Sequence, residues 1–228
     1  MSRPIPELIS IALEAAQAVS GLLLVPPGAT ACFVFAHGAG AGMTHAFMSA
    51  FADGLADRQI ATLRYQFPYM ERGSKRPDTP AVAHTAVRAA VVEAGRRCSG
   101  IALIAGGKSF GARMTSQAQA ACPLPGVSGL AFVGFPLHPA GKPSVQRAEH
   151  LSQVDVPMLF LQGTRDKLAG LDLLSPVVER LGPGATLSLA DDADHAFHVR
   201  ARSGRTDEQA MSAMLDCFSG WVSQLRAT

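Results

Sequence analysis

The chain has 228 residues, of which 48% are hydrophobic and 17% are charged, and its formal net charge is +2. This length suits one domain with one core, and the composition is globular rather than disordered. Nucleic-acid and membrane-surface partners need clustered positive charge, and the sequence has no lysine-rich run or basic helix face, so we expect neither partner. No apolar stretch is as long as a membrane span and the first residues do not resemble a signal peptide, so we expect a cytoplasmic protein.

Strands and helices alternate along the sequence, starting with a segment that allows two readings. Residues 9–25 predict an antiparallel strand pair, although their alanines leave a short helix over 7–18 as an alternative. A buried strand over 31–36, a helix over 44–56 and a strand over 60–65 follow. Residues 66–78 are rich in aromatic and charged side chains, and we expect an irregular loop there.

The same alternation continues to the end of the chain. We predict a strand over 101–105 that Gly106 breaks. The other predicted elements are helices over 79–97, 110–121, 168–181 and 206–225, and strands over 129–134, 157–161 and 186–189. This pattern is typical of an α/β fold, and we expect a single domain over 1–228 with a mainly parallel sheet of about seven to eight strands flanked by helices.

The four cysteines, Cys32, Cys98, Cys122 and Cys217, are widely spaced and include no CxxC pair. We therefore expect buried free thiols rather than a zinc site or a disulfide framework.

The strongest chemical signal is Gly107-Lys108-Ser109-Phe110-Gly111, a G-x-S-x-G pattern between a buried strand and a helix. A serine nucleophile lies on such a strained turn so that its hydroxyl projects above the sheet. Glycine is needed on both sides because a Cβ there would collide with the neighbouring strand and helix. The backbone amide of Phe110, at the positive end of the helix, would face a developing oxyanion. The pattern thus predicts Ser109 as a nucleophile and Phe110 as an oxyanion donor.

A second glycine-rich turn, His37-Gly38-Ala39-Gly40, ends the strand over 31–36. It favours the Ala39 amide as the other oxyanion donor, because glycines let N–H groups face a substrate. A phosphate-binding turn is the alternative, but residues 38–43 lack the G-x-G-x-x-G spacing and no P-loop lysine follows. We expect His37 to brace this loop rather than to act in catalysis. We expect Lys108 and Arg113 to be solvated or to brace loops, with a role as substrate clamps as the alternative.

Two further residues follow strands in an informative order. Asp166 comes just after the strand over 157–161, and His195 comes just after the strand over 186–189. Carboxyl ends of parallel strands meet at one edge of a sheet, and Ser, Asp, His is the chain order of the α/β-hydrolase fold. Asp166 could instead be a plain helix cap. The nearby aspartates and His198 could suggest a metal, but no HxxE- or HExxH-like helix accompanies them, so we expect no metal and no cofactor.

Five runs, FAHGAGAGMTHAFM, RYQFPYM, GGKSFGAR, LFLQGTRD and DADHAFHV, resemble those of the KANL3/Tex30-type α/β-hydrolases, which are near the dienelactone hydrolases. The resemblance spans roughly residues 20–225. It implies an α/β-hydrolase fold with a nucleophile at Ser109, an acid at Asp166 and a base at His195. Dienelactone hydrolases proper use a cysteine nucleophile, so the serine here favours ester over enol-lactone chemistry.

Too little chain separates the strands over 129–134 and 157–161 for a large cap domain, so we expect a pocket that is open or covered by short loops. Its predicted wall residues are Phe67, Tyr69, Met70, Phe135, Leu137 and His138. Packing of the aromatic residues among them in the core is the alternative. The sequence thus predicts a serine hydrolase that cleaves a small carboxylic ester or thioester through an acyl-enzyme. A non-catalytic protein-interaction module with a hydrolase fold and an acyltransferase remain as alternatives.

Overall fold

The structure is a computed structural model that describes residues 4–14 and 17–226. In this part of the chain, eight strands form one sheet in the order β1-β2-β4-β3-β5-β6-β7-β8. The strands are β1 (Glu7–Ala12), β2 (Ala18–Leu24), β3 (Ala31–Ala36), β4 (Ile60–Tyr65), β5 (Ala102–Lys108), β6 (Val127–Val133), β7 (Met158–Gly163) and β8 (Ala185–Ala190). β1 and β2 are antiparallel to their neighbours, whereas the other six strands, β3 to β8, are parallel to one another.

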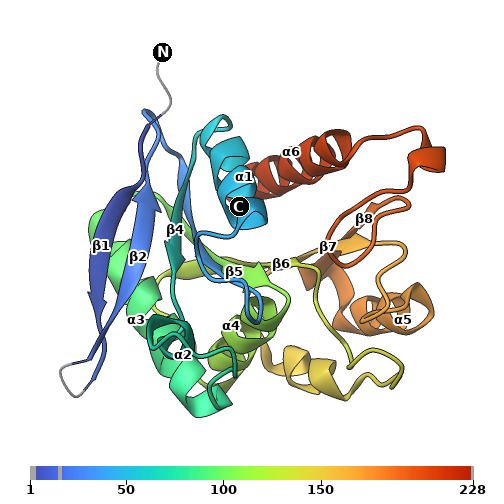
Figure 1. Ribbon diagram of the computed structural model, residues 1–228, viewed down its shortest axis with the longest axis horizontal. Coiled ribbons are helices and arrows are strands. Elements are labelled where there is room, and N and C mark those ends of the chain that lie inside the picture. Colours follow the sequence, from blue (N-terminus) through green and yellow to red (C-terminus); the bar gives the residue numbers. More distant parts are fainter. Residues whose placement is uncertain (1–3, 15–16, 227–228) are drawn as a thin grey trace.

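Helices cover both faces of this sheet, with α1 and α6 on one side and α3, α4 and α5 on the other (Figure 1). The helices are α1 (Ala46–Ala56), α2 (Pro68–Glu71), α3 (Pro80–Arg97), α4 (Phe110–Ala121), α5 (Leu171–Leu181) and α6 (Asp207–Leu225), with short 3₁₀ segments η1 (Gln146–Gln153), η2 (Gly182–Gly184) and η3 (Ala201–Ser203). The prediction of an α/β fold with a mainly parallel sheet is confirmed. No element in the described residues forms a separate cap: between β6 and β7 the chain makes only a loop and η1.

Strand β3 shows why both faces are covered. Its side chains alternate across the sheet, so Cys32 and Val34 join the core beneath α3 and α4, whereas Phe33 and Phe35 join the core beneath α1 and α6. The ring of Phe33 lies 4.9 Å from that of Phe218 on α6. A strand buried on both faces reads as a continuous apolar run, as ACFVFA does.

The sheet order also fixes where a site can form. β4 lies on one side of β3, and β5, the next strand along the chain, lies on the other side. The direction in which strands are added to the sheet therefore reverses at β3. In open α/β sheets such a switch point leaves a crevice at the carboxyl ends of the strands. The segments that follow β3, β5, β7 and β8 all emerge at this edge.

Several sequence predictions need correction. The alternative of a helix over 7–18 is wrong, since β1 pairs with β2 from Glu7 to Ala12. Residues 66–78 are not wholly irregular, because Pro68 starts the short helix α2. Helix α1 begins at Ala46, since the His45 side chain accepts the Phe47 amide as an N-cap.

Two more corrections concern β5 and the thiols. β5 does not break at Gly106, because Gly106 and Gly107 continue the ladders with both β3 and β6, and the strand runs to Lys108. Burial of the thiols holds for Cys32 and Cys98 only, since Cys217 is half-buried and Cys122, at the end of α4, is exposed.

Candidate active site

Ser109 lies on the turn between β5 and α4, with φ 52° and ψ −109°. Few residues other than glycine adopt a positive φ, and such strain clusters at functional sites. The flanking glycines make this turn possible. A Cβ at Gly107 would lie 2.6 Å from the Ala36 carbonyl oxygen, and a Cβ at Gly111 would lie 2.5 Å from it. The predicted reason for both glycines, close approach to a neighbouring strand and helix, is confirmed.

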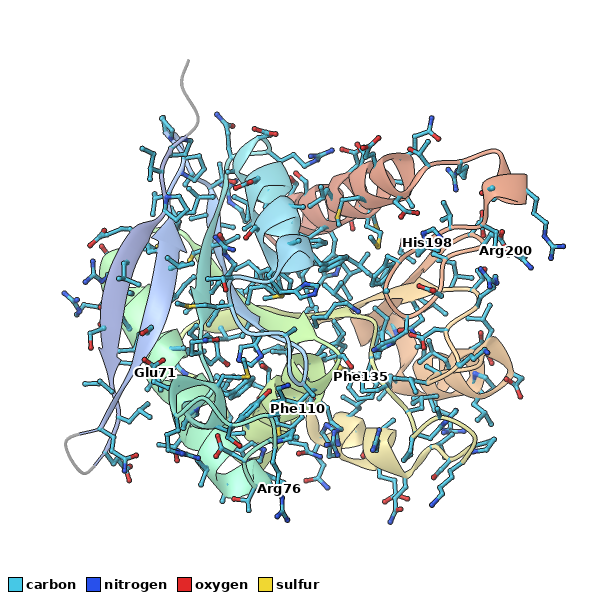
Figure 2. All side chains as sticks on the ribbon, in the orientation of Figure 1. Glu71, Arg76, Phe110, Phe135, His198 and Arg200 are labelled. Atoms are coloured by element: carbon cyan, nitrogen blue, oxygen red, sulfur yellow. The ribbon has the colours of Figure 1, made fainter. Side chains whose placement is uncertain are left out.

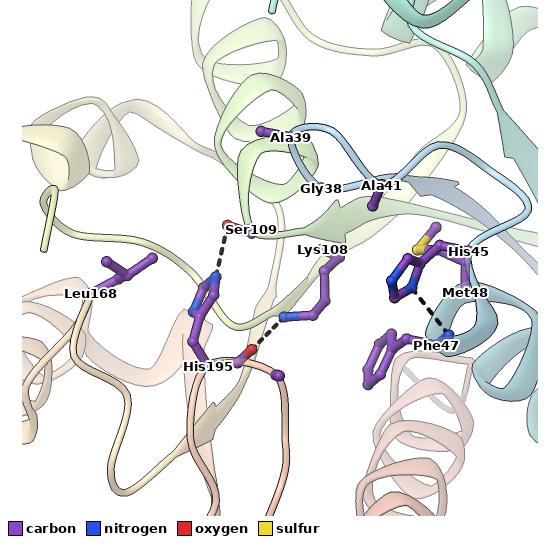
Figure 3. Close-up of a pocket in the computed structure, with 11 residues that line it drawn as sticks. Gly38, Ala39, Ala41, His45, Phe47, Met48, Lys108, Ser109, Leu168 and His195 are labelled. Carbon is purple, nitrogen blue, oxygen red and sulfur yellow. Dashed lines mark hydrogen bonds between the residues drawn. The ribbon is translucent and has the colours of Figure 1, made fainter. Parts of the chain in front are cut away.

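His195 bridges the other two predicted residues. Its Nε2 lies 2.8 Å from Ser109 Oγ, and its Nδ1 lies 2.6 Å from Asp166 Oδ2 (Figure 3 shows the first contact). The three side chains come from the ends of β5, β7 and β8, and they form one continuous hydrogen-bonded chain. This geometry suits the tautomer with its Nδ1 hydrogen toward the carboxylate and its Nε2 lone pair toward the hydroxyl.

The loop that carries His195 is held at several points. A bridge pairs Ala193 with Val199, and the Arg165 amide donates to the Ala193 carbonyl. The Asp194 carboxylate accepts the amides of Ala196 and His198, which tightens the turn around His195. The loop therefore presents the imidazole from a fixed backbone.

Asp166 is 3% exposed, and its carboxylate has hydrogen-bond partners besides His195. Oδ1 accepts the Leu168 amide at 2.8 Å, and Oδ2 accepts the Gln162 side-chain amide at 2.5 Å. The alternative that Asp166 is a plain helix cap is wrong, because the N-cap of α5 is Gly170. Sequence reasoning missed Gln162, although a polar residue near the end of the buried run MLFLQG is a visible signal.

The Gln162 side chain has a second contact that ties two strands together. Its Oε1 accepts the Phe135 amide at 2.9 Å, just after β6, while its Nε2 donates to Asp166 after β7. Both hydrogen-bonding groups of this buried amide are thus used, and both act on segments that line the carboxyl edge of the sheet.

The two amides predicted as oxyanion donors flank Ser109. Ala39 lies in the loop after β3 and lines the cavity above Ser109, and Phe110 is the first residue of α4 (Figure 3 labels Ala39). Neither amide donates to an acceptor among the described residues. The Gly40 amide, by contrast, donates to Tyr69 Oη at 3.0 Å. The amides of Ala39 and Phe110 are therefore available as donors to a substrate oxygen.

His37 braces this loop, as predicted. Its Nε2 accepts the Phe67 amide at 3.1 Å, so Nδ1 carries the hydrogen and donates to the Gly38 carbonyl at 2.7 Å. Burial lowers the pKa of His37 to about 4, and the Gly38 contact only partly offsets this. The side chain is therefore a neutral structural link between the Ala39 loop and the chain after β4.

A cavity of about 360 Å³ opens beside Ser109. Most of the residues that line this cavity are apolar. The full lining is Gly38, Ala39, Ala41, His45, Phe47, Met48, Lys108, Ser109, Leu168, His195 and Ala196. Phe47 and Met48, at the start of α1, form one wall (Figure 3). Such a cavity suits a small, largely apolar group next to the hydroxyl.

The prediction of six wall residues is wrong for this cavity, and the alternative, packing in the core, describes the aromatic residues among them. None of Phe67, Tyr69, Met70, Phe135, Leu137 and His138 lines this cavity. Phe67 and Tyr69 are fully buried, and their rings pack against Phe110. Phe135 and Leu137 are fully buried as well, and the Phe135 ring packs against Phe132 and Phe160. Met70 joins the same core from its edge, and the His138 ring contacts the Pro139 carbonyl.

Lys108 and Arg113 differ in their hydrogen bonding. Lys108 is only partly exposed: it lines the cavity and its Nζ donates to the His195 carbonyl at 2.6 Å, which agrees with a loop-bracing role. Arg113 lies one turn into α4, and its buried Nε has no hydrogen-bond partner in the described residues. Burial and nearby Arg147 lower the pKa of Arg113.

The acidic residues near His195 are engaged in ion pairs and turns. Asp192 pairs with Arg200, and His198 pairs with Asp207 at the start of α6. Figure 2 shows His198 and Arg200 at the periphery of the molecule, away from Phe110. Among residues 4–14 and 17–226, no group of three His, Cys, Asp or Glu side chains is arranged to hold a metal. The same residues contain no helix that is both long and apolar enough to span a bilayer.

A strained serine turn lies at the carboxyl edge of the parallel sheet, and a histidine and an aspartate that follow later strands complete the contact. These features together define the α/β-hydrolase class of proteins. Residues 29–223 match the family described as "Alpha/beta hydrolase domain", and the chain belongs to that family. The predicted identity as an α/β-hydrolase is confirmed at this level.

Solved structures share the fold across nearly the whole chain. A dienelactone hydrolase from Anabaena variabilis is 19% identical, with a TM-score of 0.77 over 98% of this chain and 99% of that one. XC6422 from Xanthomonas campestris, described as an α/β serine hydrolase without lid, is 18% identical, with a TM-score of 0.70 over 99% and 95%. Est1E from Butyrivibrio proteoclasticus is 13% identical, with a TM-score of 0.71 over 97% and 99%. At these identities the likeness concerns the fold.

Proposed function

We propose that the protein is a serine hydrolase that cleaves a small carboxylic ester or thioester through an acyl-enzyme. The observation that carries the proposal is the hydrogen-bonded chain from Ser109 Oγ through the His195 imidazole to the Asp166 carboxylate. Its serine adopts a strained positive-φ turn beside a cavity, and both neighbouring amides lack an acceptor. Structural serines have no need of this combination.

In the proposed reaction, Ser109 Oγ attacks the carbonyl carbon while its proton passes to His195 Nε2. The electron pair of the carbonyl moves to its oxygen, and the amides of Ala39 and Phe110 donate to that oxyanion. Asp166 holds the imidazole tautomer and stabilises its cation. The bond to the alcohol or thiol then breaks, the leaving group takes the proton from His195, and an acyl-Ser109 ester remains. Water repeats these steps and releases the acid.

The cavity supports a small substrate. A volume of about 360 Å³ bounded by Phe47, Met48 and Leu168 accommodates a short or compact acyl group but not a long lipid. Among the structural neighbours, one is described as an esterase domain and another as Est1E with ferulic acid bound. Their descriptions and the serine at position 109 favour ester chemistry over the cysteine-dependent chemistry of dienelactone hydrolases proper.

Within the α/β-hydrolase family, we propose that the chain is of the KANL3/Tex30 type. The five sequence runs that support this include Ser109, Asp166 and His195. The contact between all three side chains favours an enzyme over a non-catalytic interaction module, because a protein without catalysis has no physical need to keep them in register.

A fluorophosphonate probe tests the proposal directly, because it reacts only with an activated serine. We expect it to label Ser109 and expect Ser109→Ala to remove both labelling and turnover of p-nitrophenyl acetate, since loss of the nucleophile costs orders of magnitude in rate. Ser116 supplies an internal control: its Oγ lies 2.8 Å from His150 Nε2, but it sits inside α4 rather than on a strained turn. Labelling of Ser116, or full turnover by Ser109→Ala, would refute the proposal.

A further inference from the structure

Lys108, the last residue of β5, occupies an unusual position for a lysine. Its Nζ donates to the main-chain carbonyl of His195 at 2.6 Å (Figure 3). The ammonium group lies 5.3 Å from the ring centre of Phe47 and 5.0 Å from that of Phe197, and these two rings stack on each other. A cation near aromatic ring faces is attracted by their negative potential. The ammonium group therefore ties β5, the start of α1 and the loop after β8 together.

The hydrogen bond of Lys108 is made to His195, the residue whose imidazole contacts Ser109. The consecutive residues Lys108 and Ser109 hold His195 at both of its ends: Lys108 holds the main-chain carbonyl, and Ser109 Oγ contacts imidazole Nε2. Asp166 holds the remaining ring nitrogen. A shift of the His195 backbone would move the imidazole relative to Ser109, and misplacement by about 1 Å costs on the order of 100-fold in rate.

We propose that Lys108 is a positioning residue, whose protonated side chain fixes the His195 backbone so that the imidazole reaches Ser109. This inference rests on the proposed function, since it concerns how the base of that reaction is held.

The surroundings of Nζ favour this role over a purely structural one. The hydrogen-bond partner of Lys108 Nζ is a neutral main-chain carbonyl rather than a carboxylate, and the side chain is largely withdrawn from water. Withdrawal of a cation from water without a directly bonded carboxylate costs free energy. Gly134, with φ +70°, leaves the space that Nζ needs: a Cβ there would lie 3.3 Å from Nζ and 3.5 Å from His195 Nδ1. An apolar side chain would fill this space at lower cost, so stability alone does not account for a lysine.

The charge on Lys108 is itself adjustable. Burial lowers the pKa of Lys108 to about 8, although Asp166 and Asp194 oppose the shift. The other titratable groups beside it are His195 itself and His45, which lines the same cavity from the start of α1. Deprotonation removes the attraction to the two rings and leaves a weaker donor to the His195 carbonyl. The hold on His195 should therefore weaken as the pH rises through about 8.

Steady-state kinetics with p-nitrophenyl acetate between about pH 6 and 10 test the inference. We expect Lys108→Met to lower kcat at pH 7 by about 10- to 100-fold with little change in KM, and to abolish the alkaline fall in kcat near pH 8. We expect Lys108→Arg to recover most of kcat at pH 7 and to keep it at pH 9, because a guanidinium stays protonated. Lys167→Met and Lys167→Arg, at an exposed lysine next to Asp166, are the matched controls and should behave as wild type.

A purely structural lysine would give a different result. Removal of a largely desolvated cation should leave the melting temperature of Lys108→Met unchanged or raised, so a fall in kcat without a fall in stability supports positioning. Equal losses of kcat in both Lys108 variants, together with a lower melting temperature, would overturn the inference. An increase in KM at constant kcat would also overturn it, since that result assigns Lys108 to substrate binding.

A measurement on the resting protein separates this inference from the proposed function. The ¹⁵N shifts of the His195 imidazole should change near pH 8 in the wild type but not in Lys108→Met. If the probe never labels Ser109 but this step appears, the proposed function fails while the link between Lys108 and His195 stands. If the probe labels Ser109 and the step is absent, the link fails alone.

Discussion

Gln162 donates its side-chain amide to Asp166 Oδ2, the carboxylate oxygen that also contacts His195. The same glutamine accepts the Phe135 amide, so one buried side chain joins the ends of β6 and β7 behind the imidazole. Asp166 thus has a fixed orientation before any substrate binds. Preorganised groups of this kind cost no rearrangement during reaction.

Replacement of Gln162 by leucine should weaken both stability and catalysis. We expect a loss of about 2–4 kcal/mol in the free energy of unfolding, because the Phe135 amide and Asp166 each lose a buried partner. We also expect kcat to fall about tenfold or more, because the carboxylate can turn away from His195. Urea denaturation and ester turnover measure the two effects.

Gln119 provides a closely matched control for this substitution. It is also buried, donates to the Asp155 carboxylate and accepts the Leu124 amide, but it lies away from Ser109. Gln119→Leu should therefore cost similar stability and leave kcat within about twofold. An equal fall of kcat in the two variants would show that general destabilisation, rather than the position of Asp166, is responsible.

The strained turn predicts a strong intolerance of any side chain at Gly111. A Cβ there would lie 2.5 Å from the backbone oxygen of Ala36, which cannot move without disturbing β3. We expect Gly111→Ala to lower the unfolding free energy by about 3 kcal/mol or more. Gly220, exposed in α6 with no atom within 4 Å of an added Cβ, is the contrasting site. Gly220→Ala should stabilise the protein by up to about 1 kcal/mol. Chemical denaturation of the two variants measures whether the unfolding free energy falls in Gly111→Ala and rises in Gly220→Ala.

The neutral state of His37 predicts a specific pH dependence of stability. Its folded-state pKa of about 4 lies below the ordinary value of about 6.5, so the unfolded chain binds more protons between these values. Stability from this group is complete above pH 6.5 and is lost as the pH falls toward 4. From pH 7 to 4.5 we expect His37 to account for about 2–3 kcal/mol of lost unfolding free energy.

Urea unfolding at both pH values isolates this contribution. His37→Gln should be less stable than wild type at pH 7 but should lose less stability on acidification. His45→Gln alters an exposed histidine and should keep the wild-type pH dependence. A His37 variant with an unchanged slope would show that other groups, such as half-buried His150, carry the acid sensitivity.

The cavity wall predicts acyl-chain selectivity. Phe47 lines the cavity beside Met48, so Phe47→Ala should enlarge it and shift the preference of kcat/KM from short toward longer acyl groups. A panel of p-nitrophenyl esters from acetate to octanoate measures the shift. Val92→Ala, at an exposed position of α3, should retain the wild-type order. An unchanged order in Phe47→Ala would exclude this cavity as the acyl site.

The sequence by itself determined the frame of this protein and the positions of the three linked side chains. The frame follows from local pattern, since alternating apolar runs and helical periods require a covered sheet, and the carboxyl ends of its parallel strands converge on one edge. Ser109 is marked by a turn that only flanking glycines permit, and Asp166 and His195 are marked by their place after strands.

Only the tertiary structure decided which side chains surround those three. Phe67 and Tyr69 are aromatic and come just after β4, yet their side chains lie in the core, where they pack on Phe110. The cavity wall comes from the start of α1 instead. Gln162 contacts the Phe135 amide and Lys108 contacts the His195 carbonyl, and both contacts join segments that are distant along the chain. A sequence pattern records the spacing of residues along one element, whereas contacts of this kind depend on how separate elements pack against each other.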